Sequence, residues 1–208
     1  MNHIINREVI NQIQLSYTDK PLAIFILGPN GSGKSTLRYY LNLSEIQTNI
    51  DPDVLNRIYY RLYPENYQRV ATKAALKMYA GALTYGLNLC MESTLAGYGT
   101  MKRIRDAKAK GYAVIVYFVG LNSVELNLAR VQQRVANGGH NIPENIIRKR
   151  YVESINNLKL IQKYCDVIHV LDNSDSCYRI QFTKSDGKQK QYTHTLEPWA
   201  SELISHLN

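Results

Sequence analysis

Apolar residues occur along the chain in two alternating patterns. Short apolar or alternating segments bounded by Gly, Pro, Asn or Asp predict β-strands, and longer segments with apolar positions three or four residues apart predict helices. The predicted strands are 22–27, 46–50, 87–91, 112–119, 166–171, 178–182 and 191–194. The predicted helices are 4–16, 37–41, 54–63, 65–85, 98–110, one that begins at Asn122 and ends before 136, 143–163, and one that starts at Pro198.

The order of these elements predicts the fold class. Strands that alternate with helices form a parallel sheet through right-handed crossovers, with helices on both faces. We therefore expect one α/β domain over residues 1–175. Residues 176–208 break the alternation, because two strands flank a turn at Ser185-Asp186-Gly187 and a helix follows. This segment predicts a C-terminal β-hairpin and helix packed on the same domain.

A phosphate-binding pattern follows the first predicted strand. The residues Gly28-Pro29-Asn30-Gly31-Ser32-Gly33-Lys34-Ser35-Thr36, called the phosphate loop below, fit G-x-x-x-x-G-K-[ST] at every fixed position. The glycines let backbone N–H groups turn toward phosphate oxygens, and the helix that follows adds the positive end of its dipole. Lys34 can reach the outer phosphates of ATP, and Ser35 can offer its hydroxyl to Mg²⁺. The sequence therefore predicts a P-loop protein that binds a nucleoside triphosphate.

Acidic residues stand where two other predicted strands end. Asp51 and Asp53 follow the second strand, and Glu92 and Thr94 follow the third. Ligands of parallel α/β sheets bind beyond the carboxyl ends of the strands, so we expect these side chains and the phosphate loop to share one cleft. A carboxylate there can accept the proton of a substrate hydroxyl. The residues alone leave open whether Asp51 or Asp53 does so, or whether they are only a turn residue and a helix cap.

Cationic side chains are available to cover the phosphates. Arg130 and Arg134, four residues apart, share one face of a predicted helix and can fold over the phosphates as a lid. His140, in the glycine-rich loop that follows, either contacts phosphate or bonds only to its own loop. Asp172, after the fifth strand, resembles the metal-holding aspartate of nucleotide hydrolases, but it has no neighbouring carboxylate and we do not assign it a metal.

The composition and charge of the chain favour some classes of binding partner over others. The chain of 208 residues has a formal net charge of +8, which fits an anionic ligand or an acidic partner protein. Nucleic acid is not favoured, because the basic residues are scattered apart from Arg148-Lys149-Arg150, a natural exposed helix face. The longest apolar run, 113–119, is too short to span a membrane, and the N-terminus lacks a signal-peptide layout. We therefore expect a soluble, cytoplasmic protein.

Several motifs occur in a recognisable order. They are the phosphate loop, Ile50-Asp51-Pro52-Asp53, Met91-Glu92-Ser93-Thr94, Arg130-Val131-Gln132-Gln133-Arg134, Gly138-Gly139-His140-Asn141-Ile142-Pro143 and Asn157-Leu158. This series, over roughly residues 22 to 173, resembles the zeta toxin family, especially its shorter branch of predicted ATPases. The resemblance implies a nucleotide-kinase-like P-loop fold and a kinase that depends on ATP and Mg²⁺. The best-studied members phosphorylate the 3′-hydroxyl of the sugar in UDP-N-acetylglucosamine and are held inactive by an antitoxin.

The resemblance also implies roles for individual residues. Carried over by position, Lys34 would hold the ATP phosphates, Asp53 would be the base, and Glu92 and Thr94 would position the substrate with Asp51 beside them. Arg134 would be the lid arginine, with Arg130 as the alternative, and both would bind ATP. His140 stands where those toxins have a second arginine.

A different class of function stays open. The chain could be an ATP-binding regulatory or nucleic-acid-processing P-loop protein without a small-molecule acceptor. Transporter-type ATPases are not favoured, because the chain lacks their Leu-Ser-Gly-Gly-Gln type signature. The pair Asp53 and Glu92 favours the kinase, since a protein that only binds ATP needs no acceptor base.

Overall fold

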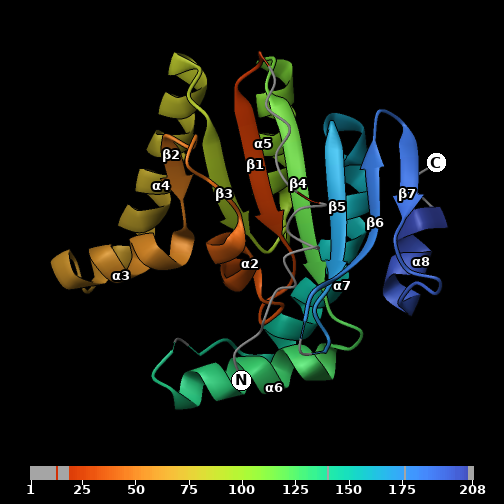
Figure 1. The fold of residues 1–208 in the computed structure, drawn as a ribbon. Coiled ribbons are helices and arrows are strands. Elements are labelled where there is room, and N and C mark those ends of the chain that lie inside the picture. Colours follow the sequence, from red (N-terminus) through yellow and green to blue (C-terminus); the bar gives the residue numbers. More distant parts are fainter. Residues whose placement is uncertain (1–12, 14–18, 140, 176, 206–208) are drawn as a thin grey trace.

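A single seven-stranded sheet organises the protein. The computed structural model describes residues 13, 19–139, 141–175 and 177–205. The sheet has the order β2-β3-β1-β4-β5-β6-β7, in which β1 to β5 are parallel and β6 and β7 are antiparallel additions (Figure 1). The strands are β1 (Leu22–Leu27), β2 (Thr48–Ile50), β3 (Leu89–Ser93), β4 (Ala113–Gly120), β5 (Val167–Asp172), β6 (Arg179–Ser185) and β7 (Lys188–Gln191).

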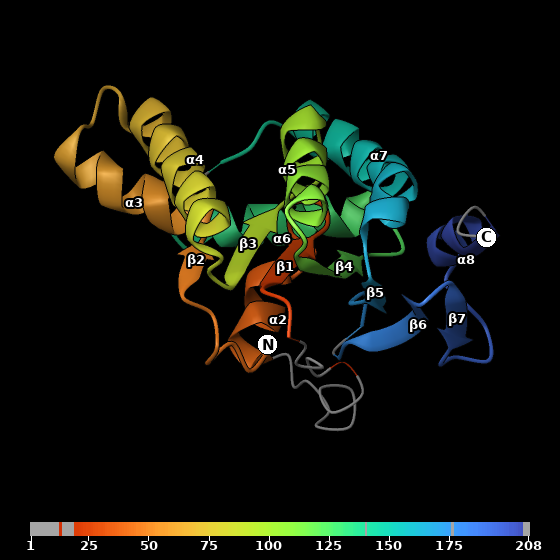
Figure 2. The same ribbon diagram turned by 90° about the horizontal axis from the view of Figure 1, so that it is seen from above.

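Helices cover both faces of this sheet. They are α2 (Lys34–Tyr40), α3 (Pro52–Leu62), α4 (Tyr67–Tyr85), α5 (Tyr98–Ala109), α6 (Val124–Ala136), α7 (Glu144–Ile161) and α8 (Pro198–Ser205), with a 3₁₀ turn at Gln162–Tyr164. Figure 2 shows α4, α5 and α7 on one face and α2 on the other. Figure 1 shows α6 lying beyond the carboxyl ends of the parallel strands. The predicted α/β class with a C-terminal hairpin and helix is confirmed.

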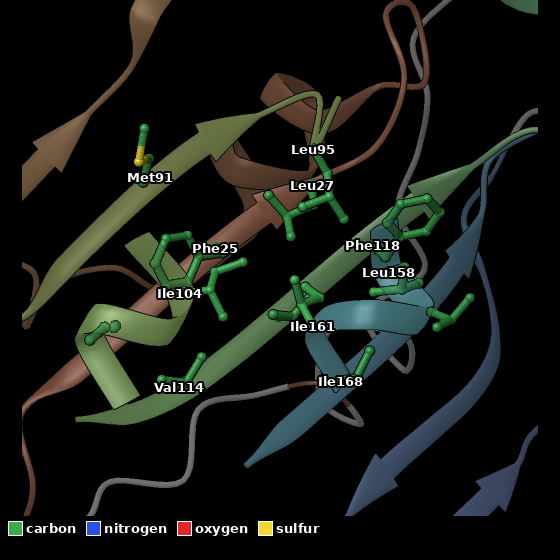
Figure 3. Packing of buried hydrophobic residues seen from close by; sticks show 14 of the residues in the cluster. Phe25, Leu27, Met91, Leu95, Ile104, Val114, Phe118, Leu158, Ile161 and Ile168 are labelled. Carbon is green, nitrogen blue, oxygen red and sulfur yellow. The ribbon is translucent and has the colours of Figure 1, made fainter. Parts of the chain in front are cut away.

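The central strand explains why both faces need cover. All six residues of β1 are buried, and alternate side chains point to opposite faces. Phe25 and Leu27 enter the cluster under α4, α5, α7 and α8, whereas Ile24 and Ile26 enter the cluster under α2. Figure 3 shows part of the first cluster, with Phe25 and Leu27 among side chains from β3, β4, α5 and α7. Such doubly buried strands read as unbroken apolar runs.

Most predicted boundaries agree with the structure to within two or three residues, and three local predictions are wrong. The second hairpin strand is β7 at Lys188–Gln191 rather than 191–194, because Asp186 and Gly187 both have positive φ and close a two-residue turn. The helix predicted to begin at Asn122 begins at Val124, and Ser123 caps it by accepting a hydrogen bond from the Leu126 N–H. Pro143 precedes α7 instead of forming its first residue.

The predicted N-terminal helix over 4–16 lies outside the described residues except for Ile13. Ile13 is fully buried, and its carbonyl accepts a hydrogen bond of 2.7 Å from the Tyr117 hydroxyl. Among the residues that the structure describes, none of the helices has both the length and the apolarity that crossing a membrane requires.

Candidate functional site

The phosphate loop is held from outside by hydrogen bonds to its carbonyl groups. Asn127 of α6 donates to the Asn30 carbonyl, and Asn173, just after β5, donates to the Ser32 carbonyl at 2.8 Å. The Tyr178 hydroxyl donates to the Gly33 carbonyl at 2.6 Å. A loop whose carbonyls are engaged on its outer side can direct its N–H groups inward, which is the arrangement that binds phosphate.

Gly33 shows why this loop requires glycine. Its φ is +101°, in the left-handed region that residues with a Cβ rarely adopt. A Cβ added there would lie 2.3 Å from Asn173 Nδ2 and 2.7 Å from the Tyr178 hydroxyl. The two side chains that brace the loop therefore leave room only for a glycine.

Lys34, Ser35 and Glu92 lie together at the start of α2. Lys34 is buried, and its Nζ donates a hydrogen bond of 2.9 Å to the Pro29 carbonyl. The Ser35 hydroxyl lies 3.0 and 3.1 Å from the two carboxylate oxygens of Glu92, which is also buried. The end of β3 thus brings an acidic side chain against the phosphate loop.

Burial changes the proton affinities of this pair. Desolvation lowers the pKa of Lys34, although the negative charges of Glu92 and Asp53 oppose the shift. Desolvation likewise raises the pKa of Glu92, and the positive charge of Lys34 opposes that shift. Perturbed titratable groups in a cleft are typical of functional sites, because burial makes their charges respond strongly to a ligand.

The two aspartates after β2 have different surroundings. Asp51 caps α3, because its Oδ1 accepts hydrogen bonds from the N–H groups of Asp53 and Val54 at 2.9 and 3.2 Å. Its other oxygen, Oδ2, forms an ion pair of 3.2 Å with Arg38. Asp53 is exposed in the first turn of α3, and its charge acts on Lys34. Asp51 is therefore occupied by structural contacts, whereas Asp53 faces solvent near the phosphate loop.

The loop after β3 is held in an unusual conformation. Leu95 has a φ of +58°, which is rare for a bulky residue, and its side chain is fully buried beside Leu27 (Figure 3). The Asn157 side chain of α7 donates a hydrogen bond of 2.8 Å to the Leu95 carbonyl. Thr94, immediately before Leu95, remains partly exposed. Backbone strain of this kind persists only where the surroundings hold it, and it is frequent at functional sites.

The predicted lid residues do not behave alike. Arg130 donates hydrogen bonds of 2.8 and 3.3 Å to the carbonyls of Asn173 and Ser174, so it contacts the segment after β5. Arg134 is exposed in the last turn of α6, and its positive charge lowers the pKa of Lys34. His140 lies outside the described residues. The structure therefore brings the charge of Arg134 to the site and uses Arg130 within the fold.

The sequence did not point to the residues that brace the loop. Asn127, Asn173 and Tyr178 contact it directly, and Arg150 of α7 donates a hydrogen bond of 3.1 Å to Asn30 Oδ1. Asn173 and Tyr178 follow β5, a strand end of the same kind that drew attention to Asp51 and Glu92. At this strand end the sequence drew attention to Asp172, whereas the residue that contacts the loop is the next one, Asn173.

Asp172 has a structural role. It is fully buried, and its oxygens accept hydrogen bonds from Ser174, Arg179 and the Trp199 indole. These bonds tie β5 to β6 and α8.

The side chains fit ATP and Mg²⁺. The loop offers a cradle for phosphates and a buried cation, and Ser35 with Glu92 supplies the oxygen ligands that Mg²⁺ prefers. An acidic side chain, Asp53, stands nearby for an acceptor. The arrangement can bind a triphosphate and place a second substrate next to it.

Comparison with known proteins identifies the family of this chain. The family model described as zeta toxin matches residues 7–197, which is most of the chain. The chain belongs to the zeta toxin family. An uncharacterized protein of Haemophilus influenzae is 40% identical to this chain over 132 residues, which span 62% of this chain and 91% of the relative.

Solved structures support the same P-loop, kinase-like fold. A chain of the PezAT chromosomal toxin–antitoxin system of Streptococcus pneumoniae superimposes with a TM-score of 0.60 at 18% identity, over 97% of this chain and 90% of that one. A chain of the AvrRxo1-ORF1:AvrRxo1-ORF2 complex with ATP gives a TM-score of 0.65 at 13% identity, over 90% of this chain and 63% of that one. At these identities the likeness shows the fold alone.

Proposed function

We propose that this protein is an ATP-dependent kinase that transfers the γ-phosphate of ATP to a hydroxyl group of a small molecule. One observation carries the proposal: the buried Glu92 carboxylate lies 3.0 and 3.1 Å from the Ser35 hydroxyl of the phosphate loop, and a second carboxylate, Asp53, is exposed in the first turn of α3. A protein that only binds ATP could use Glu92 for a metal but would have no need of Asp53 as an acceptor base. UDP-N-acetylglucosamine is the first acceptor to test, because members of the family phosphorylate it.

Each residue has a role in the proposed reaction. The phosphate loop and Lys34 bind the triphosphate, and Ser35 with Glu92 would hold Mg²⁺. When bound, Mg²⁺ neutralises charge on the phosphates. Glu92 and Thr94 position the acceptor, and Asp51, whose oxygens cap α3 and pair with Arg38, holds the start of the helix that carries Asp53. Arg134 balances the charge that develops during transfer.

In the proposed transfer, the γ-phosphorus exchanges a bond to ADP for a bond to the acceptor. The acceptor oxygen forms a bond to the γ-phosphorus while the bond from that phosphorus to the β,γ-bridging oxygen breaks, and ADP leaves. Asp53 accepts the proton of the acceptor hydroxyl. The products are ADP, a phosphate ester of the acceptor and a proton.

The test is direct detection of the phosphorylated acceptor. The full chain is incubated with ATP, Mg²⁺ and UDP-N-acetylglucosamine, then with a panel of sugars, nucleotide sugars and nucleosides, and products are identified by mass spectrometry and ³¹P NMR. Lys34→Ala is the matched control and should form no product and lose stabilisation by ATP. Hydrolysis of ATP to ADP without any phosphorylated acceptor would instead favour an ATPase with a regulatory or nucleic-acid-processing role.

We also propose an acidic antitoxin as a protein partner. The net charge of +8 suits such a partner. Of the two solved structures of this fold described above, one comes from the PezAT toxin–antitoxin system and the other from the AvrRxo1-ORF1:AvrRxo1-ORF2 complex. The proposed reaction uses ATP and would take place in the cytoplasm. If a neighbouring reading frame encodes a small acidic protein, its co-expression should relieve growth inhibition by this chain, and its product should co-purify with the chain. Growth that is unaffected by the chain alone would contradict the toxic role.

A further inference from the structure

Arg150 differs from its neighbours in the basic run Arg148-Lys149-Arg150 of α7. Arg148 and Lys149 are exposed, and each forms ion pairs with glutamates. Arg150 is half-buried, and its Nη1 donates a hydrogen bond of 3.1 Å to Asn30 Oδ1 in the phosphate loop. Within the described residues, no carboxylate lies at ion-pair distance from Arg150. Its cation is therefore directed at the loop without a counter-charge.

The packing of α7 against α6 sets this position. Ile147 of α7 contacts Leu128 and Val131 of α6 in a small hydrophobic cluster of its own. Arg150 follows Ile147 by three residues and so lies on the same side of α7. Its positive charge lowers the pKa of Lys34, as that of Arg134 does. Arg150 is thus placed by a rigid helix near the lysine that would hold the outer phosphates.

We propose that Arg150 is a phosphate-contacting residue whose guanidinium binds the terminal phosphate of ATP in the phosphate loop. The proposal rests on the proposed function only for the binding of ATP by this loop. A guanidinium stays charged at any working pH and matches phosphate oxygens with two parallel N–H groups. Its present partner, Asn30 Oδ1, is neutral, so exchanging that bond for a charged phosphate oxygen is favourable. The site would then hold Arg150 and Arg134 as two arginines on separate helices.

Nucleotide binding tests this role without knowledge of the acceptor. Dissociation constants for ADP and for the non-hydrolysable ATP analogue AMP-PNP are measured with Mg²⁺ by titration calorimetry. Arg150→Gln keeps an N–H donor in reach of Asn30 but has no charge. We expect it to weaken AMP-PNP binding about ten- to a hundredfold, as for loss of a charge-assisted hydrogen bond, and to leave ADP binding within about twofold. Arg150→Lys should keep part of the preference for AMP-PNP.

Arg148→Gln is the matched control, because Arg148 is on the same helix and contacts only glutamates among the described residues. It should bind both nucleotides like the wild type. Equal weakening of ADP and AMP-PNP by Arg150→Gln would overturn the proposal, because Arg150 would then only brace the loop. Unchanged binding of AMP-PNP would overturn it too. If Arg150→Gln fails to fold, the dissociation constants of Arg150→Lys for ADP and AMP-PNP are compared with those of the wild type instead.

The outcome is independent of whether the protein is a kinase. If the wild type binds AMP-PNP but phosphorylates no acceptor, the kinase proposal fails while the role of Arg150 stands. If the wild type binds neither nucleotide, the proposed function and this inference both fail. If an acceptor is phosphorylated but Arg150→Gln keeps its preference for AMP-PNP, only this inference fails.

Discussion

The Ser35 hydroxyl donates to the Glu92 carboxylate, whose two oxygens lie 3.0 and 3.1 Å away. This contact joins the helix that follows the phosphate loop to the end of β3. It brings together the hydroxyl expected to bind Mg²⁺ and the carboxylate expected to position the acceptor. The Glu92 carboxylate must be ionised to serve either purpose.

The first prediction concerns pH. Burial raises the pKa of Glu92, so the protonated form persists to higher pH than for an ordinary glutamate. Activity should therefore be lost as the pH falls through this raised pKa, and the acid limb of kcat/KM should lie above the usual range of a glutamate. Glu92→Gln should lower turnover by about two orders of magnitude and remove that limb. Exposed Glu65→Gln is the control. An acid limb that survives unchanged in Glu92→Gln would show that another group titrates.

The second prediction separates the two aspartates. Asp53→Asn cannot accept a proton and should lower turnover by about two to four orders of magnitude with nearly unchanged ATP affinity. Asp51→Ala removes the cap of α3 and the ion pair with Arg38, so it should cost about 1–2 kcal/mol of stability, or several degrees in Tm. Turnover with a saturating acceptor and thermal melts measure the two effects. If Asp51→Asn loses most of its turnover while Asp53→Asn turns over like the wild type, Asp51 is the base instead.

The third prediction concerns the strained loop at Leu95. Asn157→Ala removes the side-chain N–H that donates to the Leu95 carbonyl. The substitution should lower the free energy of unfolding by about 1–3 kcal/mol. Because Thr94 and Glu92 precede this strained residue, KM for the acceptor should rise while ATP affinity stays constant. The adjacent Asn156 is exposed, so Asn156→Ala should change stability by no more than about 0.5 kcal/mol. If KM for the acceptor is the same in Asn157→Ala and Asn156→Ala, the bond from Asn157 to Leu95 does not influence acceptor binding.

The fourth prediction tests whether residues 176–208 act with the nucleotide site. Tyr178→Phe removes only the hydroxyl that bonds to the Gly33 carbonyl, so it should weaken ATP binding several-fold and cost about 1 kcal/mol. Tyr39→Phe is the control, because Tyr39 is 85% exposed. We propose that the hairpin and helix form one folding unit with the rest of the chain. ATP affinity unchanged in Tyr178→Phe would argue that the C-terminal segment is independent of the site.

The sequence predicted those features that a local pattern encodes. The phosphate loop is a contiguous motif. The segments that form β1 and β4 are unbroken apolar runs, as expected for strands that are buried on both faces. The same patterns placed Asp53 and Glu92 at strand ends. The roles of Asp53 and Glu92 stay predictions, which the variants above test.

The contacts that hold the loop could not be predicted in this way. Tyr178 reaches Gly33 across 145 positions, Asn173 reaches Ser32 across 141 and Arg150 reaches Asn30 across 120. A single sequence holds no information on which distant side chains meet. Arg150 in particular looks like Arg148 and Lys149 until the packing of α7 is known. The hairpin likewise looked like an addition, but Tyr178, the residue before β6, donates a hydrogen bond to the Gly33 carbonyl of the loop.

The outer strand β7 affects how copies of the chain meet. Its sequence is Lys-Gln-Lys-Gln, it pairs only with β6 among the described strands, and Lys188 and Lys190 are exposed. Lysines on an edge strand oppose pairing with a strand of another molecule, since like charges would be brought together. At the opposite edge, β2 has only three residues. Neither margin of the sheet offers a long apolar strand, which protects the folded chain against edge-to-edge aggregation.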